Sequence, residues 1–175
     1  MRVLAISGSL RSESSNTTLL RAAARLAPPG VEIVIYDRIG DLPHFNPDLD
    51  GEGAEPPPAV KDLRDRLDAA AAVIICSPEY AHGVPGSLKN ALDWLVSVTV
   101  LSDKPVALVN ASPRSLFAQA QLAETLRTMA ARVIPDASVA VPLGGKKLDE
   151  AGMLADPEVA APLRAAIATL VAEVS

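Results

Sequence analysis

The stretch Val3-Leu4-Ala5-Ile6-Ser7-Gly8-Ser9 is a short continuous apolar run that ends in small polar residues. A run that is apolar throughout, rather than alternating, is typical of a strand buried on both faces, as in a parallel sheet. Similar runs recur at residues 31–36, 73–76, 106–109 and, more weakly, 139–141. The sequence therefore predicts five buried strands, the first of which leads into a loop of glycine and serines.

Between these runs, apolar residues recur at helical spacing. The residues that mark the five predicted helices are Leu19, Leu20, Ala23 and Leu26; Val60, Leu63, Leu67 and Ala70; Leu88, Ala91, Leu92 and Leu95; Leu122, Leu126, Met129 and Ala130; and Leu163, Ile167, Leu170, Val171 and Val174. Five strand–helix units predict an open, doubly wound parallel α/β sheet with helices on both faces. Two strand orders are common for such a sheet, the Rossmann order and the flavodoxin-like order 2-1-3-4-5. Residues 41–58 and 144–156 are expected to be irregular connections.

Composition narrows the class of protein. The 175 residues suit one domain spanning 1–175, and 16 Lys+Arg against 21 Asp+Glu give a net charge of −5 without a basic cluster, which argues against nucleic acid as a partner. The apolar runs are shorter than a membrane span requires, and the short apolar run at the start leads us to expect no signal peptide there. A single cysteine, Cys76, excludes an internal disulfide and a multi-thiolate metal site, and we expect it to lie buried in the core. We therefore expect a cytoplasmic protein without a bound metal.

The loop after the first predicted strand is rich in hydrogen-bond donors. Residues 8–17 contain Arg11, Asn16, Thr17 and four serines, and they lead into a helix whose first N–H groups have no helical acceptor. Hydroxyls, a guanidinium and a helix N-terminus together suit a monophosphate. The alternative interpretation is a serine-rich loop that only caps the helix. The segment lacks the patterns of a triphosphate P-loop, a dinucleotide fingerprint and a serine-hydrolase elbow.

The loop after the third predicted strand is the second unusual segment. It reads Ser77-Pro78-Glu79-Tyr80-Ala81-His82-Gly83-Val84-Pro85-Gly86, and it leads into Leu88-Lys89-Asn90-Ala91-Leu92-Asp93-Trp94-Leu95. Its glycines and prolines rigidify a turn at which backbone N–H groups can approach a planar ligand. In the flavodoxin-like order the first and third strands are neighbours, so these two loops would meet at the point where ligands bind in open α/β sheets.

These two motifs together resemble the NADPH-dependent FMN reductase family, which includes bacterial quinone, chromate and azo-dye reductases. The resemblance rests on Gly8-Ser9-Leu10-Arg11 with Ser14 and Asn16, and on the longer motif that starts at Pro78-Glu79-Tyr80 and ends at Leu95. It implies a five-stranded flavodoxin-like sheet of order 2-1-3-4-5 with helices on both faces. It also implies bound FMN, NADPH or NADH as reductant, and a homodimer or homotetramer.

Individual residues match the family's flavin-binding positions. The resemblance assigns the FMN phosphate to Ser9, Arg11, Ser14, Ser15, Asn16 and Thr17, the isoalloxazine ring to Pro78, Glu79 and Tyr80, and a ring edge to the backbone of Ala81, His82 and Gly83. Ser112 and Arg114, in a third loop, occupy the family's other ring-edge position. The family usually has Asn where this chain has Ala81, so one side-chain donor near the ring is expected to be missing.

The expected activity is electron transfer from NAD(P)H through FMN to a quinone, an azo compound, a metal oxyanion or a similar small acceptor, with no amino-acid side chain required as a catalyst. The alternatives are a flavodoxin-type electron carrier and a non-catalytic flavin-binding regulatory protein. Only 3% of residues are aromatic, and Tyr80 is the one aromatic side chain in a predicted ligand loop, which leaves one flavin face open to substrates. The low aromatic content thus favours the enzyme over the carrier.

Overall fold

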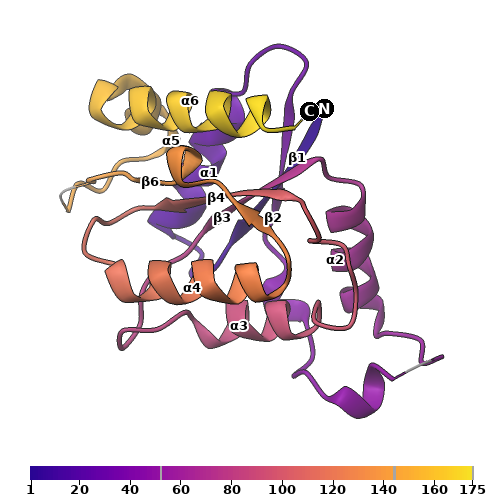
Figure 1. Ribbon diagram of the computed structural model, residues 1–175. Coiled ribbons are helices and arrows are strands. Elements are labelled where there is room, and N and C mark those ends of the chain that lie inside the picture. Colours follow the sequence, from indigo (N-terminus) through magenta and orange to yellow (C-terminus); the bar gives the residue numbers. More distant parts are fainter. Residues whose placement is uncertain (52, 144, 175) are drawn as a thin grey trace.

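In the computed structural model, which describes residues 1–51, 53–143 and 145–174, a parallel sheet is covered by helices on both faces (Figure 1). The strand order is β2-β1-β3-β4-β5, and the sheet contains β1 (Arg2–Ser7), β2 (Glu32–Tyr36), β3 (Ala72–Cys76) and β4 (Pro105–Asn110). The flavodoxin-like order is therefore confirmed, and the Rossmann order is excluded. Every residue of β3 and β4 is buried, as their continuous apolar runs predict.

The far edge of the sheet differs from the single fifth strand that the sequence predicts. It consists of two short strands, β5 (Arg132–Val133) and β6 (Val139–Ala140), which both pair with β4 and are separated by the 3-10 turn η3 (Pro135–Ala137). Pro135 has no N–H to contribute to a sheet. In the gap, side chains replace the missing strand, because the Leu108 N–H donates to Ser138 Oγ at 3.0 Å and the Leu108 carbonyl accepts from Gln119 at 3.1 Å.

The helices divide into two layers (Figure 1). Helices α1 (Ser15–Arg25), α5 (Glu150–Ala155) and α6 (Pro157–Ala172) cover one face, and α2 (Pro58–Asp68), α3 (Gly86–Asp93) and α4 (Leu116–Thr128) cover the other. Each layer encloses its own buried apolar cluster. Helix α5 lies within residues 144–156, which were expected to be an irregular connection. Gly144, the first residue of that connection, lies outside the described residues. None of the helices described is long and apolar enough to cross a membrane.

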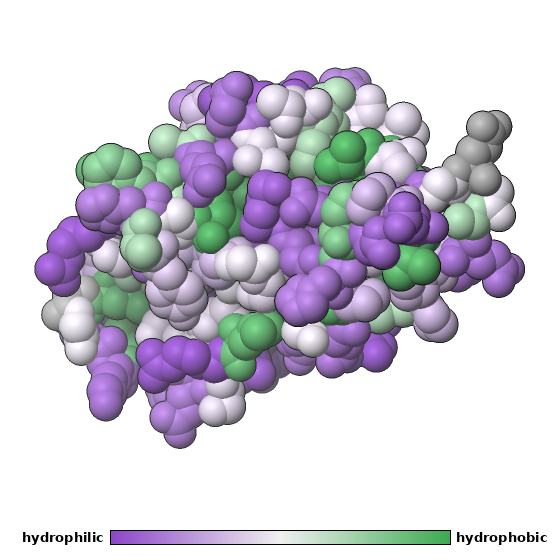
Figure 2. All heavy atoms as spheres, turned by 90° about the horizontal axis from the view of Figure 1, so that it is seen from below, coloured by the Kyte–Doolittle hydropathy of each residue, from purple (hydrophilic) through white to green (hydrophobic). Residues whose placement is uncertain are grey.

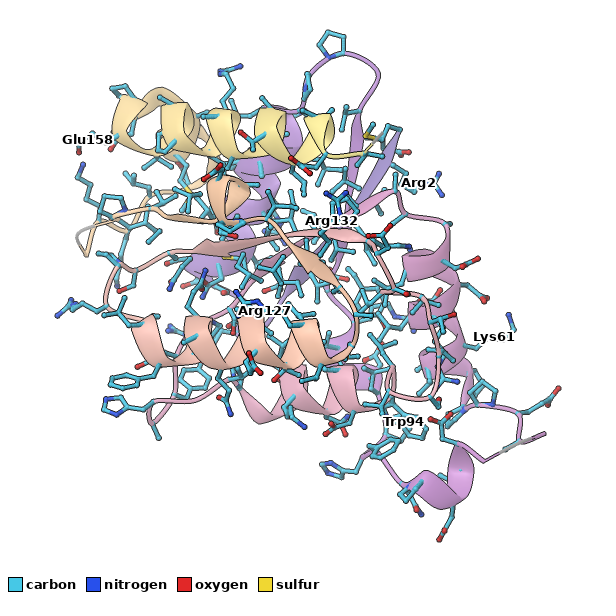
Figure 3. The ribbon with its side chains drawn as sticks, in the orientation of Figure 1. Arg2, Lys61, Trp94, Arg127, Arg132 and Glu158 are labelled. Atoms are coloured by element: carbon cyan, nitrogen blue, oxygen red, sulfur yellow. The ribbon has the colours of Figure 1, made fainter. Side chains whose placement is uncertain are left out.

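The irregular segment after β2 is held firmly against α3. It contains the short turns η1 (Ile39–Asp41) and η2 (Pro47–Leu49). Trp94 is fully buried within the chain, donates its indole N–H to the Pro43 carbonyl at 2.8 Å, and meets the Phe45 ring edge-on at 5.1 Å between centroids (Figure 3). Asp50 pairs with Arg64 at 2.7 Å; burial alone would raise the pKa of Asp50, but hydrogen bonds from Ser97 and Arg64 lower it. The connection that was expected to be irregular is thus partly packed against α2 and the end of α3.

Candidate functional site

The loops after β1 and β3 meet at the carboxyl edge of the sheet. The Gly8 N–H donates to the Cys76 carbonyl at 2.8 Å, so the two segments are in contact where β1 and β3 end. A Cβ atom at Gly8 would lie 2.8 Å from Ser77 Oγ, closer than real Cβ atoms approach their neighbours, and 3.0 Å from Leu88 Cδ2, which is a tight contact. Glycine at position 8 is therefore what allows the two candidate ligand loops to lie side by side.

Part of the first loop caps helix α1. Ser14 is its N-cap, with Oγ accepting from the Thr17 N–H at 3.4 Å and its carbonyl accepting from the Thr18 hydroxyl at 3.0 Å. The Thr17 hydroxyl shares a hydrogen bond of 2.8 Å with the buried Ser7 hydroxyl. The capping interpretation therefore applies to Ser14 and Thr17, whose hydroxyls already have partners within the chain.

The rest of this loop leaves donors available. The side chains of Arg11 and Ser15 are exposed and have no partner among the residues described, while Ser9 Oγ accepts the Arg11 N–H at 3.3 Å. Asn16 is only 8% exposed, and its Oδ1 accepts the Cys76 thiol proton, with Sγ at 3.2 Å. Its Nδ2 has no partner, yet no buried side-chain nitrogen or oxygen in the described chain is unsatisfied, so this nitrogen must reach the surface.

Cys76 has a structural role at this site. Its side chain is fully buried, as expected, and burial raises the pKa of its thiol, so the group stays protonated and unreactive at neutral pH. Because the thiol hydrogen points to Asn16 Oδ1, it orients the amide so that the free edge of Asn16 is the donor edge.

Two hollows flank the first turn of α1. One, of about 440 Å³, lies between the loop after β1 and the start of α5, and the other, of about 400 Å³, lies between the loops after β4 and β6. The first is lined by Arg11, Ser12, Glu13, Ser14, Ser15, Thr18, Arg21, Lys147, Leu148 and Asp149. The second is lined by Ser15, Ala111, Ser112, Pro113, Arg114, Pro142, Leu143, Gly145, Lys146 and Lys147. The structure thus brings Ser112 and Arg114 to the predicted phosphate loop, and it adds Arg21 and Lys147, which the sequence motifs did not single out.

The loop after β3 forms a tight turn of its own. Tyr80 and Gly83 exchange two backbone hydrogen bonds of 3.1 and 2.9 Å, and between them Ala81 and His82 have φ values of +49° and +61°. Two successive positive φ values are the pattern of a type I′ turn, which favours Asn and Gly at these positions. The N–H groups of Tyr80 and Gly83 are used by the turn, whereas those of Ala81 and His82 have no acceptor in the described chain.

This turn is fastened to the beginning of α4. Glu79 Oε2 accepts the Ala118 N–H at 2.9 Å, and Gln121 Oε1 accepts the Val84 N–H at 2.9 Å. The His82 ring stacks on Phe117, with centroids 4.2 Å apart and planes at 22°. Since the N-cap residue Ser115 makes no side-chain cap, the Glu79 carboxylate caps this helix instead. The structure therefore gives Glu79 a definite partner that the sequence did not show.

The third loop is organised by a buried asparagine. Asn110, 3% exposed, accepts the Ser112 N–H at 2.9 Å and donates to the Ser115 carbonyl at 3.3 Å. Ser112 Oγ in turn accepts the Arg114 N–H at 3.3 Å, and the Arg114 side chain is exposed without a partner in the part of the chain described. Tyr80 is 54% exposed, so its ring is also accessible at this edge.

The parallel order β2-β1-β3-β4-β5, with donor-rich loops at the ends of β1 and β3, defines a flavodoxin-like protein. A model of the NADPH-dependent FMN reductase family matches residues 1–146. An NAD(P)H-dependent FMN reductase of Pseudomonas aeruginosa is 36% identical over 161 residues, covering 89% of this chain and 85% of the relative. A probable NADPH:quinone oxidoreductase of Oryza sativa subsp. japonica is 35% identical over 172 residues, covering 94% and 84%.

Among solved structures, the flavoenzyme NAD(P)H:(acceptor) oxidoreductase FerB of Paracoccus denitrificans superposes with a TM-score of 0.77 at 28% identity, covering 99% of this chain and 96% of that one. The chain belongs to the NADPH-dependent FMN reductase family. It is an NAD(P)H-dependent, FMN-using oxidoreductase, as the resemblance implies, and the comparisons favour the enzyme over the electron carrier.

Proposed function

We propose that the FMN phosphate binds at the first turn of α1, held by the Arg11 guanidinium, the Ser15 hydroxyl, the Asn16 amide and the free N–H groups of that turn. The observation that carries this assignment is Asn16 Nδ2, a donor on a residue that is 92% buried, oriented by Cys76 and without a partner within the described chain. Ser9, Ser14 and Thr17 support the loop through the hydrogen bonds that shape it. The residues present therefore fit a phosphate monoester.

We further propose that the flavin ring lies along Pro78, Glu79 and Tyr80, with its polar edge at the turn. The available donors there are the N–H groups of Ala81 and His82, because the N–H of Gly83 is used by the Tyr80 carbonyl. Backbone donors at this position stabilise negative charge on the ring edge. On the other side, Ser112 and Arg114 reach the hollow shared with Ser15.

FMN held by these residues would supply the redox chemistry, namely hydride transfer from NAD(P)H and electron transfer to a small acceptor. The protein residues hold the phosphate, present donors at the ring edge and leave an accessible face beside Tyr80. A quinone is the acceptor we propose first, because quinone oxidoreductases are among the relatives. Phe117, which the sequence did not place near a ligand loop, adds a second exposed aromatic ring next to the turn.

The assembly that we propose is a homodimer formed through the layer of α3 and α4. Val96, Leu116 and Phe117 are large apolar side chains that are more than half exposed in this layer. Figure 2 views the molecule from the side on which α3 and α4 lie, and there apolar patches are interspersed with polar ones. We also propose that residues 1–175 form one FMN-binding domain that works in the cytoplasm, where the reduced state of the lone Cys76 is maintained.

The phosphate assignment is tested by Arg11→Ala. Loss of a charge-assisted contact of about 1.5–3 kcal/mol should raise the dissociation constant for FMN by about tenfold to a hundredfold. Binding of riboflavin, which lacks the phosphate, should stay as it is in the unmodified protein. Titration of the apoprotein followed by flavin fluorescence measures both constants, and an unchanged FMN constant would reject this site.

A further inference from the structure

The lysines at positions 146 and 147 are adjacent in sequence but have different surroundings. Lys146 Nζ lies 2.9 Å from Asp156 and 3.7 Å from Glu158, at the first turn of α6, where Figure 3 labels Glu158. The hydrogen bond to Asp156 raises the pKa of Lys146. Lys147 has no hydrogen bond or ion pair with any described residue. One charge is thus neutralised within the fold, and its neighbour is left unpaired.

The unpaired lysine, Lys147, lines both hollows beside α1, and Ser15 is the other residue that lines both. Arg11 and Arg21 line the first hollow and Arg114 lines the second, and the side chains of all three also lack partners in the described ranges. The four unpaired cations that line these two hollows repel one another, and an anionic ligand with more than one charge would relieve this repulsion.

Two carboxylates also face the first hollow, and neither neutralises Lys147. Asp149 is the N-cap of α5, with Oδ1 accepting the Gly152 N–H at 2.8 Å. Glu13 is exposed, and it forms no ion pair with another described residue. The charge available to a ligand in this hollow is therefore positive: Arg11, Arg21 and Lys147 against Glu13 and Asp149.

We infer that Lys147 is a phosphate-binding residue, which contacts a phosphate monoester from the side of the site opposite the β1 loop. This inference rests on the proposed function and extends the site to a segment that lies outside both recognised motifs. The phosphate chemistry has two sources in this reaction, the 5′-phosphate of FMN and the 2′-phosphate of NADPH. In either case, Lys147 would favour the phosphorylated ligand over its counterpart without that phosphate: FMN over riboflavin, or NADPH over NADH.

The test compares Lys147→Gln with the matched variant Lys146→Gln. Each removes one positive charge from adjacent positions, but Lys146 is paired with Asp156, whereas Lys147 has no partner among the described residues. The first arm measures dissociation constants of the apoproteins for FMN and riboflavin. For an exposed lysine, we expect Lys147→Gln to weaken FMN binding about two- to fivefold at low salt, with less effect at high salt. Riboflavin binding should not change, and Lys147→Arg should restore FMN binding.

The second arm measures KM for NADPH and for NADH in the FMN-saturated enzymes. A rise in KM for NADPH alone in Lys147→Gln, with FMN binding unchanged, identifies the 2′-phosphate as the source and also supports the inference. Equal behaviour of Lys147→Gln and Lys146→Gln in both arms overturns it. Arg11→Ala is included in the first arm to separate failure of this inference from failure of the proposed function. If Arg11→Ala weakens FMN binding and Lys147→Gln changes nothing, the proposed function stands and this inference fails.

Discussion

The loop after β1 and the loop after β3 meet at Gly8, but they differ in which of their hydrogen-bond donors are free to bind a ligand. In the first, local capping by Ser14 holds the backbone, and the side chains of Arg11, Ser15 and Asn16 are left with free donors. In the second, the Glu79 side chain and the N–H groups of Tyr80, Gly83 and Val84 are already used by the turn itself and by α4. The first loop thus offers polar and charged side chains, whereas the second offers a rigid turn at which the N–H groups of Ala81 and His82 are free.

The comparison has a consequence for how substitutions act. A change in the first loop should alter affinity for a charged ligand with little effect on stability, because its free donors hold nothing else. A change in the second should alter stability and ring-side properties together, because its groups also anchor α4. The residue where the two loops touch should affect both.

The largest structural effect is expected at that contact, in Gly8→Ala. The new Cβ would lie 2.8 Å from Ser77 Oγ and 3.1 Å from Ser77 Cβ, so Ser77 must shift, at a cost of about 1–3 kcal/mol in the free energy of unfolding. Gly86→Ala is the control, because a Cβ there meets no atom within 4 Å. Chemical denaturation measures both variants. If Gly8→Ala is as stable as Gly86→Ala, the close approach of the two loops is wrong.

A smaller effect is expected for Glu79→Ala, which removes the cap of α4. Loss of a helix cap costs about 0.5–2 kcal/mol, and Glu79→Gln should recover part of it because the amide oxygen still accepts from Ala118. The preference for FMN over riboflavin should be unchanged in both variants, since the phosphate lies at the other loop. A fall in that preference would show that Glu79 acts on the phosphate side and would contradict the division between the loops.

The smallest effect is expected for Ala81→Asn, which places a favoured residue at a positive φ. Ala81 has φ +49°, and Asn tolerates this region better than Ala, so thermal unfolding should show a stabilisation of about 0.5 kcal/mol. Leu10→Asn, at an exposed position in the first loop, is a control for the change in polarity. If Ala81→Asn shifts the reduction potential of the flavin without stabilising the protein, the Asn that is usual in the family acts on the flavin ring and not on the stability of the turn.

Much of the fold could be predicted because its signals are local. Continuous apolar runs marked β1, β3 and β4, and helical spacing marked the buried faces of α1 and α2. The split edge of β5 and β6 could not be predicted, since two-residue strands carry almost no pattern and depend on Ser138 and Gln119 to complete the β4 hydrogen bonds. The partner of Trp94 could not be predicted either, because the Pro43 carbonyl that accepts its indole N–H lies 51 residues earlier in the chain.

The sequence by itself determined the parallel sheet, the two loops at its edge and the donor types of the phosphate loop, because these follow from hydrophobic periodicity and from neighbours in the chain. The tertiary structure decided which donors remain free: Ser14 and Thr17 are engaged, while Asn16 is oriented by Cys76 from another strand. It also decided that Glu79 caps α4 and that Lys147, far along the chain, lies beside Ser15. Such partnerships depend on distances between segments remote in sequence, which only the folded chain specifies.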